Sequence, residues 1–365
     1  MSEQPIGFGV IGAGVIGPAH VEAIEAAADA RLVCVCDLIE EKARKLAEEH
    51  GAAYATSYAE MLSRDDLEAV CICTPSGLHA EHAVMAAQAG KHILSEKPLD
   101  ITLEKIDEMI LAADENGVRL AGVFQWRTMA SSRKLREAVR GGKLGKLVLG
   151  DCYQKYNRSH AYYASAGWRA TWELDGGGAL MNQGVHGVDL IQWIMGKAVR
   201  VNAHARRLVR NIPVEDTVVA LVEWETGAVG VIEGTTSVTP DRGLRVEISG
   251  DDGTIQWEWG KITAWDIPGE EGAEAEEKAQ APSTASDPLA LTSEGHQFHV
   301  EDLCQAIRTG RDPYVTGRDG RHAVEIIKAI YLSSREGGAT IELPLSYEDD
   351  GPGIYPRLGS PRLEW

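Results

Sequence analysis

Residues 6–17 read Ile-Gly-Phe-Gly-Val-Ile-Gly-Ala-Gly-Val-Ile-Gly, an apolar strand pattern that leads directly into a G-x-G-x-x-G motif. A helix is predicted immediately afterwards, over residues 15–28. The small residues would let the backbone approach a pyrophosphate, and the N-terminus of the helix would face its negative charge. Alternatively, the glycines of this motif could serve only to form a turn between the strand and the helix. The flanking strand and helix favour a dinucleotide-binding loop, because the motif is informative only in that context.

Asp37 predicts which dinucleotide would bind. It stands twenty residues past Gly17, at the end of the second predicted strand. A carboxylate there can bind both hydroxyls of the adenosine ribose and would repel a 2′-phosphate. No arginine follows Asp37 until Arg44. The sequence therefore favours NAD over NADP.

The rest of the first third of the chain alternates short apolar runs with helical patterns. Further strands are predicted at residues 31–36, 53–55, 69–73, 92–95 and 119–121, and helices at 39–49, 58–62, 79–89 and 103–116. This alternation is typical of a parallel sheet with helices on both faces.

Two motifs end later strands of this sheet. Residues 73–76 read Cys-Thr-Pro-Ser, and residues 92–98 read His-Ile-Leu-Ser-Glu-Lys-Pro. Ligands of such sheets bind beyond the carboxyl ends of the strands. Lys97 would therefore emerge at the ligand edge, and Pro98 favours an extended conformation for it. A surface lysine that merely follows a strand fits the position equally well.

Residues 176–189 read Gly-Gly-Gly-Ala-Leu-Met-Asn-Gln-Gly-Val-His-Gly-Val-Asp. A helix is predicted over residues 180–195, with Gly196 as its stop. In such a helix Asn182, His186 and Asp189 are spaced i, i+4 and i+7 and share one face. Without other evidence, a histidine such as His186 is more often a core residue whose hydrogen bonds are satisfied than a catalytic one.

The second part of the chain is rich in strands between residues 199 and 265, with helices predicted at 131–140, 296–308 and 321–336. Residues 217–224 are apolar at nearly every position, which predicts that both faces of this strand are covered. Helices can cover one face of the sheet, so the other is expected to pair with a second subunit. Residues 269–288 are rich in Glu, Ala, Ser and Pro and predict a solvated loop, with a lid as the alternative function.

The composition excludes several classes of protein. Lys and Arg number 36 and Asp and Glu 55, which gives a net charge of −19 and argues against nucleic acid or an anionic membrane as partner. No apolar run has the length of a membrane helix and no secretory segment is recognisable, so a cytoplasmic protein is expected. Cys34, Cys36, Cys71 and Cys73 lie in apolar strands without C-x-x-C spacing. They are interpreted as core residues, and no metal is expected.

Four separated motifs give the chain a resemblance to a known family. They are Val10-Ile11-Gly12-Ala13-Gly14, Cys73-Thr74-Pro75, Glu96-Lys97-Pro98, and Gly176-Gly177-Gly178-Ala179-Leu180 followed by His186 and Asp189. In this order they resemble the glucose–fructose oxidoreductase, inositol dehydrogenase and rhizopine-catabolism (Gfo/Idh/MocA) family over nearly the whole chain. The resemblance implies an α/β protein with a doubly wound Rossmann domain over residues 1–124. Residues 125–365 would form an α/β domain with a large, open, mixed and mostly antiparallel sheet.

The same resemblance implies the chemistry, which is NAD(P)-dependent oxidation or reduction of a secondary alcohol on a sugar, sugar derivative or cyclitol. The lysine of the family's E-K-P motif falls on Lys97, and its catalytic histidine falls on His186. We expect His186 to act as general base, since imidazole suits proton transfer near neutral pH, and Lys97 to stabilise charge on the reacting oxygen. Asn182 stands where inositol dehydrogenase-like members often have aspartate. An amide can orient a hydroxyl or Lys97 but cannot take a proton, and Asp189 would either orient His186 or cap backbone.

The resulting site has a cofactor part and a substrate part. The cofactor is expected to contact Gly12, Ala13, Gly14, Val15, Ile16, Asp37, Thr74, Pro75, His79, Glu96 and Lys97. A small polyhydroxylated substrate is expected to contact Lys97, Gln125, Arg127, Tyr156, Trp168, Arg169, Asn182 and His186, with Tyr162, Tyr163 and Trp172 as further aromatic surfaces. The guanidinium of Arg169 could bind a carboxylate or phosphate on that substrate.

Two other functions are compatible with these residues. One is an NAD-binding sensor without turnover, and the other is a glycosidase that uses NAD in a transient redox step. A homodimer or homotetramer through the C-terminal sheet is expected in each case.

Overall fold

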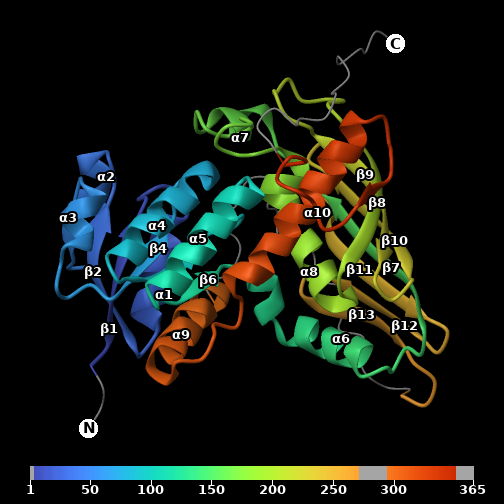
Figure 1. Cartoon of the computed structure of the whole chain (residues 1–365), viewed down its shortest axis with the longest axis horizontal. Helices are drawn as coiled ribbons and strands as arrows, with labels where there is room; N and C mark the ends of the chain where they lie inside the picture. Colours follow the sequence, from blue (N-terminus) through green and yellow to red (C-terminus); the bar gives the residue numbers. More distant parts are fainter. Residues whose placement is uncertain (1–3, 271–293, 351–365) are drawn as a thin grey trace. The chain divides into compact units, whose positions relative to one another are not determined.

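The computed structural model describes residues 4–270 and 294–350, and the chain divides into two compact units. The described residues of the first unit are 4–125 and 294–321, and those of the second are 126–270 and 322–350. Each unit contains one sheet (Figure 1). A single boundary after residue 124 was expected from the sequence, whereas the contacts also assign a late segment to the first unit.

The first unit is a six-stranded parallel sheet in the order β3-β2-β1-β4-β5-β6. Its strands are β1 (Ile6–Ile11), β2 (Ala30–Cys36), β3 (Ala53–Ala55), β4 (Ala69–Ile72), β5 (His92–Ser95) and β6 (Leu120–Gly122). The helical segments between them are α1 (Gly17–Ala26), α2 (Glu40–Glu49), α3 (Tyr58–Leu62), η1 (Ser76–Leu78), α4 (His79–Gln88) and α5 (Leu103–Glu115). The predicted parallel sheet is confirmed. Its order reverses between β1 and β4, which places the ligand edge at the carboxyl ends of these central strands.

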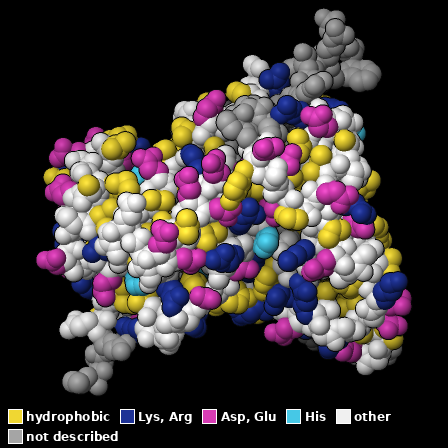
Figure 2. Space-filling view, viewed as in Figure 1, with side chains coloured by type: hydrophobic (Ala, Val, Ile, Leu, Met, Phe, Trp, Pro, Cys, Tyr) yellow, Lys and Arg dark blue, Asp and Glu magenta, His cyan; other side chains and the backbone are white. Residues whose placement is uncertain are grey.

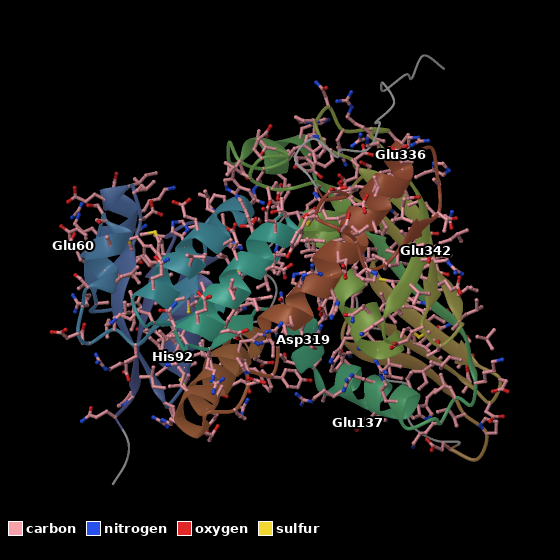
Figure 3. The ribbon with its side chains drawn as sticks, in the orientation of Figure 1. Glu60, His92, Glu137, Asp319, Glu336 and Glu342 are labelled. Atoms are coloured by element: carbon pink, nitrogen blue, oxygen red, sulfur yellow. The ribbon has the colours of Figure 1, made fainter. Side chains whose placement is uncertain are left out.

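The core of the first unit explains why the late segment belongs to it. Phe8 and Val10 of β1 are completely buried, and Val300 and Leu303 of α9 (Glu294–Thr309) pack into the same cluster. The apolar stripe of α9 is thus covered by the parallel sheet and its helices. At the amino-terminal end of β5, the Nδ1 atom of His92, labelled in Figure 3, accepts the backbone N–H of Arg119 at 2.9 Å.

The second unit contains an eight-stranded mixed sheet in the order β13-β12-β11-β7-β10-β9-β8-β14. Its strands are β7 (Leu147–Lys155), β8 (Ala198–Arg206), β9 (Thr217–Trp224), β10 (Val229–Thr235), β11 (Gly243–Gly250), β12 (Thr254–Glu258), β13 (Lys261–Asp266) and β14 (Ile341–Glu342). The helical segments along this part of the chain are η2 (Gln125–Thr128), α6 (Ala130–Arg140), α7 (His160–Ala164), η3 (Ala179–Gly184), α8 (Val185–Met195) and α10 (Gly317–Arg335). β7 and β10 pair in parallel, and the other pairs are antiparallel, as expected for this domain.

Helices cover one face of this sheet. α8 contacts β7 and β11, and α6 contacts β12 and β13. On β9, Val218 and Ala220 are buried, whereas Val219 and Leu221 are 48% and 60% exposed. Within the described residues of one chain one face of this strand is covered, and coverage of the other face by a second subunit stays a prediction. Successive side chains of a strand point to opposite faces, and only one of these faces is packed.

The helix expected over residues 180–195 is not one continuous α-helix. η3 is a π-helical turn, and α8 begins only at Val185. A Cβ on Gly184 would lie 2.9 Å from the carbonyl oxygen of Ala179, so a small residue is needed at this wide turn. The single α-helical stripe expected for Asn182, His186 and Asp189 is therefore wrong, because a wide turn changes the angular spacing before α8.

Among residues 4–270 and 294–350, no helix has both the length and the apolar character needed to cross a membrane. Acidic and basic side chains are intermixed on the face of the molecule seen in Figure 2. The acidic loop predicted at residues 269–288 lies outside the described residues except for its first two positions.

Candidate functional site

The G-x-G-x-x-G loop joins β1 to α1 and uses each glycine differently. Gly12 has a φ of +99°, and a Cβ there would lie 2.6 Å from the carbonyl oxygen of Cys73. A Cβ on Gly17 would lie 2.4 Å from the carbonyl oxygen of Gly12, so the third glycine lets the helix start against the turn. A Cβ on Gly14 would meet nothing within 4 Å, which leaves space for a ligand beside the backbone. This arrangement fits the phosphates of a dinucleotide.

The carboxylate of Asp37 is held beside this loop at the end of β2. Its Oδ2 accepts the backbone N–H of Ala13 at 2.9 Å, and its Oδ1 accepts that of Ile39 at 2.8 Å. The side chain is half-buried, while Val15 of the loop is 52% exposed. A carboxylate therefore lies next to the residues that would receive the dinucleotide.

His79 connects the two other strand-end motifs of the first unit. Its Nε2 lies 2.8 Å from the carbonyl oxygen of Thr74, and its Nδ1 lies 2.8 Å from that of Pro98. Carbonyl oxygens only accept, so both bonds form together when the ring carries a hydrogen on each nitrogen. The ring is 1% exposed and ties the Cys-Thr-Pro turn to the Glu-Lys-Pro turn. Contact of His79 with the cofactor itself stays a prediction.

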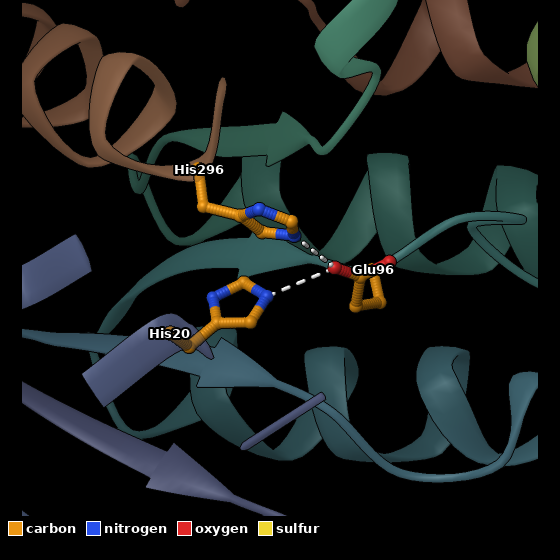
Figure 4. Close-up of side chains that lie close together, drawn as sticks. All are labelled: His20, Glu96 and His296. Atoms are coloured by element: carbon orange, nitrogen blue, oxygen red, sulfur yellow. Dashed lines mark hydrogen bonds and ion pairs between the residues drawn. The ribbon is translucent and has the colours of Figure 1, made fainter. Parts of the chain in front are cut away.

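Glu96, directly before Lys97, is held in a buried cluster with His20 of α1 and His296 of α9 (Figure 4). The Nε2 atoms of His20 and His296 lie 2.9 Å and 3.1 Å from the same oxygen, Oε1 of Glu96. The other oxygen, Oε2, accepts the backbone N–H of Lys97 at 3.2 Å. Burial by itself raises the pKa of Glu96, but the bonds from the two histidines hold it well below its usual range. The ionised carboxylate thus fixes the backbone from which the Lys97 side chain extends.

The side chains of His20, Glu96 and His296 also have the composition of a metal site, since their ligand atoms lie within 4.8 Å of one another. A histidine that binds a metal normally donates its other ring N–H to a partner. The Nδ1 atoms of His20 and His296 are buried, and neither has a hydrogen-bond partner in the part of the chain that the structure describes. Burial also lowers the pKa of His20, which favours its neutral form. We therefore interpret the cluster as two imidazoles whose Nε2–H groups donate to one carboxylate.

Glu215 holds the glycine run of the second unit in place. Its Oε2 accepts the N–H of Gly178 at 2.9 Å, and its Oε1 accepts the N–H of Leu180 at 3.0 Å and the hydroxyl of Tyr331 at 2.7 Å. A Cβ on Gly178 would lie 2.0 Å from the carbonyl oxygen of Glu215, so this approach requires glycine. Burial raises the pKa of Glu215 to about 7. Glu215 was not among the residues predicted from the sequence, because no local motif surrounds it.

Asn182 belongs to a hydrogen-bond network that includes another predicted site residue. Its Nδ2 donates to Oδ1 of Asp175 at 2.5 Å, and its Oδ1 accepts from Nε2 of Gln183 at 2.8 Å. The same Gln183 nitrogen lies 2.6 Å from the hydroxyl oxygen of Tyr162, which also accepts from Nη1 of Arg169 at 2.7 Å. The structure therefore brings Asn182 and Arg169 into one network through Tyr162 and Gln183. Gln183 and Asp175 were not among the site residues predicted from the sequence.

His186 and Asp189 both lie on α8, 6% and 1% exposed. Asp189 forms a two-pronged ion pair with Arg127, whose Nε and Nη2 lie 2.7 Å and 2.6 Å from the two carboxylate oxygens. The guanidinium also lies 5.6 Å from the ring centroid of Trp193. Asp189 thus anchors α8 to η2, a role that the sequence analysis did not consider. Direct contact of Arg127 with a substrate stays a prediction.

The remaining sequence candidates occupy different environments. Tyr156 follows the end of β7, is 5% exposed and packs edge-on against Trp259 with 6.1 Å between ring centroids. Trp168 is half-buried, with the guanidinium of Arg169 4.9 Å from its ring centroid. Gln125 is buried at the start of η2. Their contacts with substrate are untested and stay predictions.

Comparison with known proteins identifies both halves of the chain. Residues 6–124 match the family model described as "Oxidoreductase family, NAD-binding Rossmann fold". Residues 136–343 match the model described as "Oxidoreductase family, C-terminal alpha/beta domain". Myo-inositol 2-dehydrogenase of Thermotoga maritima is 28% identical over 332 residues, which cover 87% of this chain and 92% of that protein.

Solved structures agree with this match. The WlbA dehydrogenase from Bordetella pertussis, in complex with NADH and UDP-GlcNAcA, is 34% identical with a TM-score of 0.83, covering 94% of this chain and 100% of that chain. GenD2 from gentamicin A biosynthesis, in complex with NAD, is 25% identical with a TM-score of 0.80, covering 94% of this chain and 98% of that chain. With both domain models matched in order, the chain belongs to the Gfo/Idh/MocA family of NAD-binding oxidoreductases that act on CH–OH groups.

Proposed function

We propose that this protein is an NAD-dependent dehydrogenase that oxidises a secondary alcohol of a sugar, sugar derivative or cyclitol, or reduces the corresponding ketone. Residues 1–124 would bind NAD, and residues 125–365 would bind the substrate and form the subunit interface. The names of two similar proteins support this substrate class, since one is a myo-inositol dehydrogenase and the other is described in complex with NADH and UDP-GlcNAcA.

The observation that carries the proposal lies within the first unit. The glycine loop follows β1 and Lys97 follows β5, so both lie at the carboxyl edge of the same parallel sheet. Glu96 fixes the backbone N–H of Lys97, and His79 ties the following proline to the turn after β4. The edge of the sheet whose glycine loop fits a dinucleotide therefore also carries the Lys97 ammonium group. The backbone of Lys97 is held there by the bonds from Glu96 and His79.

The residues would divide the chemistry between them. Bound NAD would supply the nicotinamide that accepts the hydride. Lys97 would donate a hydrogen bond to the reacting oxygen and stabilise the negative charge that develops there. His186 would take the hydroxyl proton during oxidation and return it during reduction. Asn182, whose amide is oriented by Asp175 and Gln183, can position a hydroxyl but takes no proton.

A substrate panel tests the proposal directly. Sugars, sugar acids and cyclitols would each be incubated with the protein and NAD, and NADH formation followed by its absorbance. We expect NADH with at least one member of the panel. Release of sugar from a glycoside without net NADH would identify the glycosidase instead. NAD binding with neither reaction would identify a sensor.

We expect NAD to bind more tightly than NADP, because the Asp37 carboxylate favours a free ribose diol and repels a 2′-phosphate. Asp37→Ala should weaken NAD binding by ~1.5–3 kcal/mol, the value of a hydrogen bond to a charged group. Asp37→Asn keeps the shape of the side chain but removes its charge. It should therefore narrow the difference in binding affinity between NAD and NADP. Glu41→Ala, an exposed change on α2, is the matched control. Tighter binding of NADP to the native protein in a fluorescence titration would contradict this assignment.

The open face of the eight-stranded sheet supports assembly into a homodimer or homotetramer. Leu149, Val219, Leu221 and Val229 are between 40% and 60% exposed. The register pairs Val229 with Leu149, and β9 runs antiparallel to β10, so these apolar side chains share the uncovered face. An exposed apolar strip of this kind suits a second copy of the same sheet.

Light scattering at micromolar concentration should give two or four times the mass of the chain. Leu221→Glu should shift the protein towards the monomer, because it places a charge in the middle of the strip. Leu111→Glu changes a leucine that is 57% exposed on α5 of the first unit, and it should leave the mass unchanged. A native protein that is entirely monomeric would refute the sheet-pairing proposal.

A further inference from the structure

Two guanidinium groups lie beside the ring of Tyr162 in the second unit, and a third is linked to them through Asn157. Those of Arg169 and Arg158 lie 4.5 Å and 5.5 Å from the centroid of the Tyr162 ring. Arg210 joins them through Asn157, whose backbone carbonyl accepts from Arg158 and whose Oδ1 lies 3.3 Å from Nη2 of Arg210. This concentration of positive charge occurs in a chain with a net charge of −19.

Carboxylates balance this cluster only in part: the Asp175 charge acts on Tyr162, and the Asp216 carboxylate accepts the backbone N–H of Arg210. Within the described ranges, the only one at ion-pair distance from the three arginines is that of Asp241, 3.6 Å from Arg158. The Nε atoms of Arg158, Arg169 and Arg210 are buried and have no hydrogen-bond partner there. A buried donor without a partner costs ~1–3 kcal/mol. The cluster would therefore be stabilised by a ligand that supplies acceptors and negative charge.

The network that starts at Asp175 determines which group of Tyr162 faces such a ligand. An ionised carboxylate only accepts, so Asp175 orients the amide nitrogen of Asn182 towards itself. The Asn182 oxygen then requires a donor, which fixes the amide nitrogen of Gln183 on the side of Tyr162. With Gln183 and Arg169 both donating to the Tyr162 oxygen, the hydroxyl hydrogen is left to donate outward.

The hydroxyl keeps that hydrogen at neutral pH. Burial raises the pKa of Tyr162, and this outweighs the opposing effect of the nearby Arg169 charge. Tyr162 and Arg169 are both half-buried, so part of each side chain is exposed to solvent. A ring hydroxyl and a guanidinium, both acting as donors, are suited to a carboxylate or a phosphate.

We propose that Tyr162 and Arg169 form an anion subsite that receives a carboxylate or phosphate group of the substrate, with Arg158 and Arg210 adding positive charge around it. The inference rests on the proposed function, because the network that orients Tyr162 ends at Asn182, a residue assigned to the substrate. It narrows the substrate class from sugars, sugar derivatives and cyclitols in general to acidic ones, such as a uronic acid or a sugar attached to a phosphate.

Binding measurements test the subsite independently of turnover. The protein saturated with NADH would be titrated calorimetrically with D-glucose, D-glucuronate and UDP-glucose. We expect at least one acidic probe to bind ~10-fold or more tightly than glucose. Arg169→Met should reduce this preference by ~10–10²-fold, the effect of losing a charge-assisted hydrogen bond. Arg169→Lys should restore part of it, since a point charge lacks the planar fork of arginine.

Two further variants separate the subsite from general charge and folding effects. Arg242→Met removes an exposed positive charge outside the network and should leave the preference unchanged. Tyr162→Phe keeps the ring that lies beneath Arg169 but removes the hydroxyl donor, so the preference should fall. The melting temperature of the Tyr162→Phe variant would show whether this variant is folded.

The outcomes are distinct. Tight binding of glucuronate identifies a carboxylate as the ligand group, and tight binding of UDP-glucose identifies a phosphate. Equal affinities for the three probes, no binding of any probe, or a preference that survives Arg169→Met would each overturn the subsite. If the preference depends on Arg169 but no member of the substrate panel yields NADH with NAD, the proposed dehydrogenase fails while the anion subsite stands.

Discussion

His186→Ala should lower the rate of alcohol oxidation by ~10²–10⁴-fold, the usual contribution of a general base, on a substrate that the native protein oxidises. NAD affinity should be retained, because the glycine loop and Asp37 belong to the other compact unit. Native oxidation should accelerate as pH rises and the base loses its proton. This rise should be absent from the variant when NADH formation is followed across the pH range.

Two companion variants show whether the effect is specific to His186. Lys97→Met should lower the rate by ~10²–10³-fold through loss of charge stabilisation at the reacting oxygen, without removing the pH-dependent rise. His160→Ala replaces an exposed histidine at the start of α7 and should change neither quantity. Near-normal turnover of His186→Ala with the native pH profile would exclude His186 as the base.

Asp189→Asn should destabilise the second unit by ~3–5 kcal/mol, because it removes the negative charge that faces the buried Arg127 guanidinium. Both side chains of this pair are 1% exposed. Asp114→Asn is the matched control, since Arg318 and Asp114 form a comparable pair whose side chains are 71% and 60% exposed. An exposed pair typically contributes only ~0–1 kcal/mol. The midpoints of urea unfolding, followed by tryptophan fluorescence, would measure both effects.

Replacing both partners distinguishes a buried charge from a general packing defect. Arg127→Met combined with Asp189→Leu removes both charges and should recover most of the lost stability, because apolar side chains of similar size carry no desolvation cost. If Asp189→Asn shifts the midpoint no more than Asp114→Asn does, the ion pair does not anchor α8.

The sequence alone determined the parallel sheet, the nucleotide loop and the family. These features depend on neighbours in the chain. The strand before Gly12 and the helix after Gly17 follow from local periodicity and backbone sterics, and the structure gives each glycine a separate steric reason. Asp37 and Lys97 were placed at the carboxyl edge because each directly follows a strand, and parallel strands end at the same edge.

The partners of the site residues were decided only by the tertiary structure. Glu96 bonds to His20 and His296, which lie 76 and 200 residues away, and Arg127 pairs with Asp189 62 residues away. No local pattern encodes such contacts, because they depend on how distant elements pack. The sequence also placed Asn182 on a regular α-helix. A π-helical turn forms there instead, and its wide turn accompanies a close approach of Gly184 to Ala179. The orientation of the Asn182 amide, and through it the outward hydroxyl of Tyr162, follows from Asp175, since a carboxylate can only accept.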